Sequence, residues 1–196
     1  MNKEDFYKHW TLNYPETVPI SHLFKQEYSD RWFRIHSLPK SKRYAEKDEE
    51  WSVLLNRQNQ LITDLFGLGT PVFLVAGDYN LGDQRASYIT DEEVFKTYSF
   101  TRLDIIELFN LDSEEYDVMD IYRPSFAEII WEPNKHDRLL IEISNDNARA
   151  FFVSFDKKII AAPYDGGVDF VLKDRLERDF YKDKYKEWLS EREDGL

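Results

Sequence analysis

Apolar residues recur at intervals of three and four between Tyr44 and Phe66, and this spacing predicts the longest helix of the chain. Gln58 interrupts the apolar stripe, and Gly67 follows it, where a glycine in the left-handed conformation commonly ends a helix. The stripe consists of Trp51, Leu54, Leu55, Leu61, Ile62, Leu65 and Phe66. The opposite side of the helix is polar, so we expect the stripe to pack against a sheet.

Shorter helices are predicted on both sides of this segment. One covers Lys3 to Leu12, and a second short helix follows Ser21, which is a suitable N-cap residue. A capping box predicts a helix over Asp91 to Tyr98. The last predicted helix is amphipathic and covers Lys173 to Glu191. Its apolar residues are Leu176, Phe180, Tyr181, Tyr185, Trp188 and Leu189.

Strands are predicted wherever apolar residues alternate or form short continuous runs. Arg31 to His36 alternates, and Pro71 to Gly77 is a nearly continuous apolar run followed by a predicted loop over Asp78 to Asp83. Arg85 to Ile89 is a further candidate strand, whereas Phe100 to Leu111 fits either a helix or a strand. The later predicted strands are Asp117 to Tyr122, Phe126 to Trp131, Leu139 to Ile143, Arg149 to Phe155, Lys158 to Ala162 and Val168 to Leu172.

These elements predict an α+β fold with a mostly antiparallel sheet. A long helix follows the first strand, and the C-terminal amphipathic helix is expected to pack on the sheet. The 196 residues suit a single domain covering residues 1–196, and a subdivision near residues 112–116 stays open.

Composition excludes several classes of protein. The chain has no cysteine, so it has no disulfide, thiolate nucleophile or cysteine metal site. Its first residues are polar, and no apolar run is long enough to span a bilayer, so we expect a cytoplasmic protein with no membrane contact. The net charge of −12 would repel phosphate groups, so nucleic acid is not an expected partner.

Negative charge is concentrated between Asp91 and Asp146, where fifteen acidic residues accompany five basic ones. Acidic surface often serves solubility alone. Here aromatic residues lie among the acids, as in many protein-binding surfaces, and we expect a surface that attracts a basic protein partner. The candidate partner-binding residues are Glu115, Tyr116, Asp117, Asp120, Trp131 and Glu132.

Positive charge is concentrated between Arg31 and Arg43, which contains five basic residues and no acid. Arg34 and His36 share one face of the predicted strand, and Arg43 shortly precedes the long helix. Together, Arg34, His36 and Arg43 form a candidate site for a phosphate or carboxylate group, with His36 as the single candidate for a general acid or base. The alternative interpretation is that these side chains pair with the abundant carboxylates.

Motifs for metals and cofactors are missing. The four histidines show no metal-ligand spacing, and no phosphate-binding glycine loop or hydrolase motif is present. The stretch Asp165 to Asp169 carries two acids around Gly166 and Gly167, but it lacks the pattern of a calcium loop and is predicted to be a hairpin turn. We therefore expect no metal and no cofactor.

Several stretches resemble a family of small uncharacterised bacterial proteins that is classed as a domain of unknown function. The resemblance lies in Leu23-Phe24, Arg34-Ile35, Tyr164 to Asp169, and Tyr185 to Leu189. Gly166 and Gly167 stand where the family pattern has an aspartate and an arginine. The resemblance implies an α+β fold and a bacterial cytoplasmic protein, and it supplies no catalytic residue.

Size, acidity and the absence of cysteine also make the chain similar in type to immunity proteins that neutralise secreted toxins. Our first hypothesis is a non-enzymatic binding protein that covers the basic catalytic domain of a cognate toxin. The alternative is an enzyme or sensor that binds an anionic small molecule through Arg34, His36 and Arg43. A structural component of a larger complex is a third hypothesis.

Overall fold

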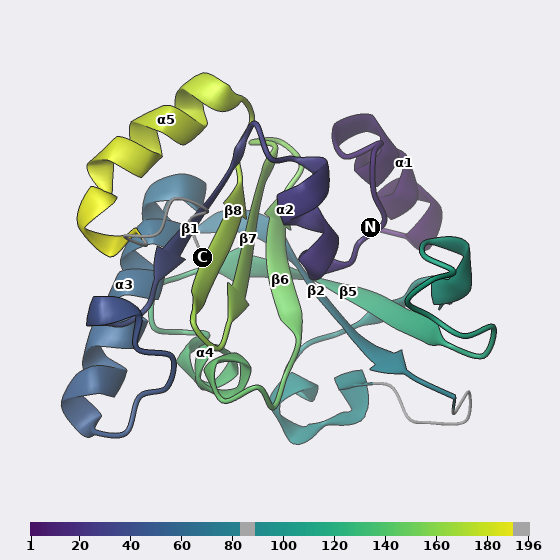
Figure 1. Ribbon diagram of the computed structural model, residues 1–196, viewed down its shortest axis with the longest axis horizontal. Coiled ribbons are helices and arrows are strands. Elements are labelled where there is room, and N and C mark those ends of the chain that lie inside the picture. Colours follow the sequence, from purple (N-terminus) through teal and green to yellow (C-terminus); the bar gives the residue numbers. More distant parts are fainter. Residues whose placement is uncertain (83–88, 190–196) are drawn as a thin grey trace.

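The computed structural model describes residues 1–82 and 89–189, and within them the chain forms one antiparallel sheet with helices on both faces (Figure 1). The strands run in the order β1-β8-β7-β6-β2-β5-β3, and β4 also pairs with β5. Their bounds are β1 Trp32–His36, β2 Thr70–Asn80, β3 Thr101–Arg102, β4 Ile106–Glu107, β5 Ile121–Trp131, β6 Ala150–Ser154, β7 Ile159–Tyr164 and β8 Gly167–Val171. The predicted α+β fold is confirmed.

The helices match the prediction at both ends of the chain and after the first strand. They are α1 Lys3–Asn13, α2 Phe24–Glu27, α3 Asp48–Phe66, α4 Asp137–Ser144 and α5 Arg175–Lys184. The C-terminal helix is shorter than predicted, and a 3-10 turn over Lys186–Trp188 follows it. The segment predicted as a helix over Asp91 to Tyr98 instead contains two 3-10 turns, Ile89–Asp91 and Glu93–Phe95.

Two strand predictions were wrong, each for a physical reason. The strands predicted on either side of Pro124 are one strand, because β5 continues through the proline. The backbone of Pro124 faces β3 rather than β2, so the missing N–H removes no hydrogen bond to β2. The Pro124 carbonyl accepts from Leu103 N at 3.0 Å. Leu139 to Ile143 forms α4 rather than a strand, with Leu139, Leu140 and Ile143 buried on one side of the helix.

Other boundaries also differ from the prediction. β2 continues through Asp78 to Asn80, which were predicted to be a loop. The ambiguous segment Phe100 to Leu111 contains β3, β4 and a 3-10 turn over Leu108–Asn110. Of the candidate strand Arg85 to Ile89, residues 85–88 lie outside the described part of the chain, and Ile89 begins a 3-10 turn.

The sheet has a core on each face. On one face, α3 and α4 pack through Leu61, Phe66, Leu140 and other apolar side chains against β2, β7 and β8. On the other face, an aromatic cluster that includes Phe6 and Trp10 of α1 and Phe24 of α2 covers the same strands. Each fully buried large side chain contributes roughly 1.5–3 kcal/mol, so the two cores hold the central strands rigidly. Functional side chains are therefore expected at the sheet margins and on the connections.

Candidate functional site

The first candidate site is residues 104–120, which we call the acidic surface. This segment lies along the outer edge of β5, where β4 pairs Ile106 with Tyr122 and Leu108 N donates to Asp120 O at 3.0 Å. Leu108 is fully buried beside Ile20 and Tyr122, so it anchors the segment to the fold. Leu108 therefore holds the other residues of the acidic surface in a fixed position on the fold.

Two aspartates shape this segment from within. Asp112 Oδ1 accepts from the backbone N–H groups of Glu114 and Glu115, at 2.9 and 3.1 Å. Asp120 is buried and accepts from Gly82 N at 2.9 Å and from Asp117 N at 2.8 Å. Side-chain acceptors of this kind satisfy turn N–H groups and fix local backbone conformation. Asp112 and Asp120 thus fix the turns of the acidic surface and the positions of the side chains beside them.

Charge on the acidic surface has one sign. Its acids are Asp104, Glu107, Asp112, Glu114, Glu115, Asp117 and Asp120, and it contains no basic residue. Within the described residues, only Asp104 of these forms an ion pair, with Lys3 Nζ at 2.9 Å. The remaining carboxylates lie close together without a compensating cation, which produces a strong negative potential.

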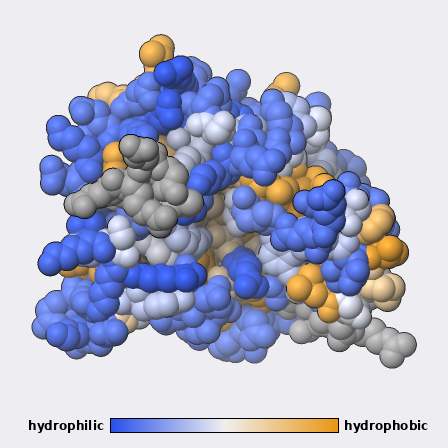
Figure 2. Space-filling model, in the orientation of Figure 1, coloured by the Kyte–Doolittle hydropathy of each residue, from blue (hydrophilic) through white to orange (hydrophobic). Residues whose placement is uncertain are grey.

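Apolar side chains are exposed between these acids. Their exposed fractions are 50% for Ile105, 39% for Phe109, 42% for Leu111, 70% for Val118 and 50% for Met119. Figure 2 shows apolar residues gathered on the right-hand side of the molecule, near one end of β5. Exposed apolar groups with a charged rim are typical of surfaces that bind another protein.

The structure brings together four of the six predicted partner-binding residues. Glu115 and Asp117 are exposed, Tyr116 is half-buried, and Asp120 is buried as described above. Burial raises the pKa of Tyr116, and the adjacent Glu115 raises it further, so the phenol stays neutral.

Trp131 and Glu132 do not belong to this surface. Trp131 is fully buried in the core, and its Nε1 donates to Thr63 Oγ1 at 2.9 Å. Glu132 is exposed and paired with Lys135, but it follows the opposite end of β5. Ten residues of strand separate Ile121 from Trp131, a span of about 33 Å at roughly 3.3 Å per residue. Trp131 was therefore wrongly assigned to a surface, because an apolar residue between acids can equally point inward.

The basic cluster predicted around Arg34 is also real in space, but its charges are paired. Arg34 forms two hydrogen bonds with Asp169, from Nε to Oδ1 at 2.5 Å and from Nη2 to Oδ2 at 2.8 Å. Its guanidinium lies 4.4 Å from the ring centroid of Tyr164. Burial lowers the pKa of Arg34, but hydrogen bonding to Asp169 and its charge outweigh that effect and raise it. This arrangement ties β1 to β8.

Arg43 also has a carboxylate partner, although its side chain is 64% exposed. Its Nε donates to Asp165 Oδ2 at 2.5 Å, and the Tyr44 hydroxyl donates to the same oxygen at 2.8 Å. Asp165 and Asp169 thus place a carboxylate on each arginine of the candidate anion site. A phosphate bound between the two guanidinium groups would therefore have to compete with carboxylates that are already in place.

His36 is the third residue of that cluster. It is 8% exposed, and Nε2 has no hydrogen-bond partner among the described residues. Burial lowers the pKa of His36, and the positive charges of Arg34 and Arg57 lower it further. A neutral, enclosed imidazole next to paired arginines is poorly placed to contact an incoming substrate.

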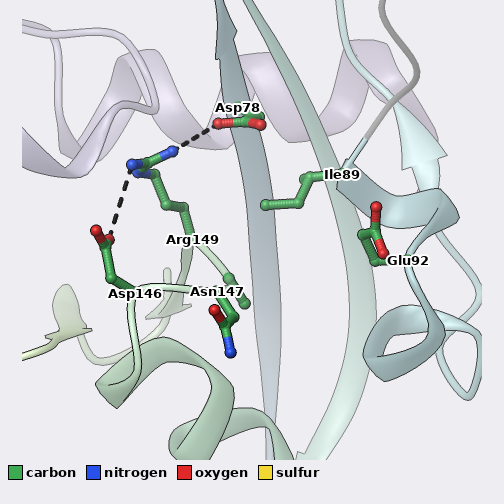
Figure 3. Close-up of a pocket in the computed structure, with 7 residues that line it drawn as sticks. Asp78, Ile89, Glu92, Asp146, Asn147 and Arg149 are labelled. Atoms are coloured by element: carbon green, nitrogen blue, oxygen red, sulfur yellow. Dashed lines mark hydrogen bonds and ion pairs between the residues drawn. The ribbon is translucent and has the colours of Figure 1, made fainter.

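A polar groove lies beside the β7–β8 turn and consists of two adjoining hollows. The first, of about 240 Å³, is shown in Figure 3, where Arg149 lies between Asp78 and Asp146. Arg149 Nη1 is 2.7 Å from Asp78 Oδ1, and Nη2 is 3.7 Å from Asp146 Oδ1. The second hollow, of about 140 Å³, also contacts Arg149 and reaches Tyr164. Its arginines, like Arg34, already have carboxylate partners.

Neither a metal centre nor a spanning helix is found in the described part of the chain. No group of three or more His, Asp or Glu side chains there is arranged to hold a metal ion. No helix in residues 1–82 and 89–189 combines the length and the apolar character needed to cross a membrane. The predicted hairpin joins β7 to β8, but only Asp165 and Gly166 form its turn, because Gly167 to Asp169 already belong to β8.

A family model for a domain of unknown function, DUF3885, matches residues 20–193. The chain belongs to this family. The match covers the acidic surface and the Arg34 cluster, and it begins after α1. No curated protein and no solved structure is significantly similar to the chain. The DUF3885 match carries a family but no activity, so function must be argued from the surface itself.

Sequence reasoning missed the exposed apolar residues that separate the acids, above all Val118 and Met119. Both were assigned to the predicted strand Asp117 to Tyr122, but β5 begins only at Ile121, and residues 117–120 belong to a turn-containing stretch rich in acids. An apolar residue in such a stretch has little secondary structure to bury it. Its exposure nevertheless depends on tertiary packing, which the pattern alone does not specify.

Proposed function

We propose that this DUF3885 protein is a non-enzymatic binding protein whose acidic surface covers a basic domain of another protein. In this proposal the protein is a bacterial immunity protein that neutralises a cognate toxin. One observation carries the proposal: seven acids, no base and five exposed apolar side chains share one anchored segment. That combination suits a basic partner that also has apolar side chains to bury.

The two kinds of residue have separate tasks in this proposal. Unpaired carboxylates such as Glu114 and Glu115 accelerate encounter with a positively charged domain, and salt weakens this effect. Exposed apolar side chains such as Val118 lose contact with water in the complex, which slows dissociation. Occlusion of a toxin active site needs slow dissociation more than fast encounter, so both features support a neutralising role.

The alternative function, an enzyme or sensor for an anionic small molecule, has less geometric support. Asp169 accepts two hydrogen bonds from Arg34, and Asp165 accepts one from Arg43. Releasing Arg34 from Asp169 would leave a partly buried charge without its partner, which is costly. We therefore place the binding function on the acidic surface rather than on the arginine cluster.

The test is co-purification with the product of the neighbouring gene, followed by calorimetric titration at low and high salt. Val118→Asp replaces an exposed apolar side chain of the acidic surface by a charge that resists burial against a partner, and we expect it to weaken binding at least about tenfold. Leu176→Asp is the matched control, since Leu176 is 82% exposed on α5 and remote in sequence from the acidic surface.

Tight, salt-sensitive binding that Val118→Asp weakens and Leu176→Asp preserves would support the proposal. Protection of cells from the neighbouring gene product by the wild-type chain, lost in Val118→Asp, would support the immunity role in particular. Equal behaviour of the two variants, with both folded by circular dichroism, would contradict the assignment of the surface.

A further inference from the structure

β5 is paired with β2 along its whole length but with its outer neighbours along only part of it. Leu108 N donates to Asp120 O and Leu103 N to Pro124 O, both at 3.0 Å, so the backbone of even-numbered residues faces outward. Trp131 O accepts from Gly69 N at 2.9 Å on the opposite side, as the alternation requires. Glu128 and Ile130 therefore direct their N–H and C=O groups outward, beyond the last pair with β3.

This part of the edge is nearly unpaired. Among the described residues, the only hydrogen bond to the outward groups of Glu128 and Ile130 is from His136 Nε2 to Ile130 O, at 3.3 Å. His136 Nδ1 lies 3.0 Å from the Tyr98 hydroxyl, which donates to it, because Nε2 carries the proton. Both N–H groups and the Glu128 carbonyl are left for another partner. Exposed strand edges of this kind pair readily with a further strand.

A cavity lies where β3 would continue alongside β5. If β3 extended backward in its register with β5, Tyr98 would face Ile129 and Thr97 would face Ile130. The chain instead turns away, and Tyr98 N donates to Phe95 O at 3.0 Å. The resulting cavity of about 370 Å³ is lined by Thr97, Tyr98, Ile129, Ile130, Lys135 and His136.

We propose that this edge receives an extended segment of a partner protein as an added strand, antiparallel to β5. The segment replaces the missing continuation of β3 and bonds to the outward backbone groups of Glu128 and Ile130. Thr97 and Tyr98 form a wall on the far side of the cavity. This wall leaves space for one extended segment, whereas the sheet of a second copy would collide with Thr97 and Tyr98.

The side chains at the edge define the segment that fits. A residue opposite Ile129 enters the cavity between Tyr98 and His136, so an apolar or aromatic side chain is required. Glu128 Oε1 accepts from the N-terminal ammonium group of Met1, but 55% of the Glu128 side chain stays accessible, so its second oxygen favours a basic residue opposite. Ile130 is 42% exposed and favours a β-branched residue opposite. From its N-terminus, the antiparallel segment therefore has a β-branched residue opposite Ile130, an aromatic residue opposite Ile129 and a basic residue opposite Glu128.

This inference does not rest on the acidic surface. The edge follows the opposite end of β5, and it recognises backbone and one pocket rather than net charge. A failure of either proposal leaves the other standing.

The probe is the peptide acetyl-Thr-Val-Phe-Lys-Thr-amide, titrated into the full chain to roughly 5 mM, because three main-chain bonds and one anchor give weak binding. Amide resonances of Glu128 and Ile130 should shift, and their hydrogen exchange should slow. Two matched peptides carry one N-methyl group each. A methyl on the lysine amide removes the bond to the Glu128 carbonyl and should weaken binding about fivefold or more, whereas a methyl on the phenylalanine amide points away from β5 and should not.

A protein variant gives a second, independent readout. Ile130→Pro removes an outward N–H that makes no bond in the described structure, so the fold should persist while peptide affinity falls about fivefold or more. Equal affinity for the two methylated peptides, or unchanged Glu128 and Ile130 amides on titration, would overturn the proposal. Protection of those amides in the protein alone, with a dimer in ultracentrifugation, would assign the edge to a second copy and would also overturn it.

Discussion

Replacement of Asp169 by Asn should destabilise the protein strongly, because Asp169 is the only ion-pair partner of Arg34 within the described residues. The two side chains are 13% and 16% exposed and share two hydrogen bonds. Asparagine keeps one acceptor but removes the negative charge and leaves the Arg34 charge without compensation. A buried pair broken on one side costs about 3–5 kcal/mol, and the residual exposure places this one at about 3 kcal/mol.

Urea denaturation followed by tryptophan fluorescence measures this loss, and thermal denaturation should show a fall in Tm of roughly 6–12 °C. A double-mutant cycle with Arg34→Met should give a coupling energy of about 2–3 kcal/mol. The control is Glu93→Gln in the exposed Glu93–Lys96 pair, which should leave the unfolding midpoint unchanged. Coupling near zero, together with stabilisation of the wild type by phosphate, would refute the reasoning and show that Arg34 is available to an anion.

Three further outcomes are expected. Gly167→Ala should lower the free energy of unfolding by more than about 2 kcal/mol, measured in urea, because the added Cβ would lie 1.9 Å from the Ile35 carbonyl oxygen. Burial lowers the pKa of His136 below its usual 6.5, so protonation favours the unfolded chain. His136 should therefore make the free energy of unfolding fall as the pH drops below about 6.5, with a contribution of at most about 1.4 kcal/mol per pH unit, and His136→Gln should remove that contribution from the slope. Trp131→Phe should reduce stability by about 1–3 kcal/mol through the lost volume and the lost bond to Thr63, yet leave partner affinity unchanged in calorimetry.

The fold class was predictable because the α3 stripe, the short turns and the apolar runs all obey local rules. Errors arose where tertiary context decides between local alternatives. The run Leu139 to Ile143 fits a buried strand as well as a helix, and only the packing of α4 beside β7 selects the helix. Pro124 is compatible with a strand only because its missing N–H faces the less paired side of β5, which no local pattern reveals.

The candidate sites show a similar division. The absence of bases from the acidic surface is visible in the sequence, whereas the exposure of Val118 and the burial of Trp131 depend on tertiary packing. Arg34 and Arg43 both lie near Tyr164. Their neutralisation by Asp169 and Asp165 depends on a pairing across more than a hundred residues, from β1 to the β7–β8 hairpin. The sequence left that alternative open.

The most direct test of the proposed binding role is the association rate of the neighbouring gene product, measured by stopped flow at low and high salt. The Glu114→Lys, Glu115→Lys double variant reverses two charges on the acidic surface. Asp183→Lys with Glu187→Lys makes the same change in net charge on exposed residues at the C-terminal end of α5 and just beyond it. We predict that the first pair slows association at least about tenfold at low salt and that the second pair has a much smaller effect. Equal slowing by both pairs, or association that does not depend on salt, would contradict the account.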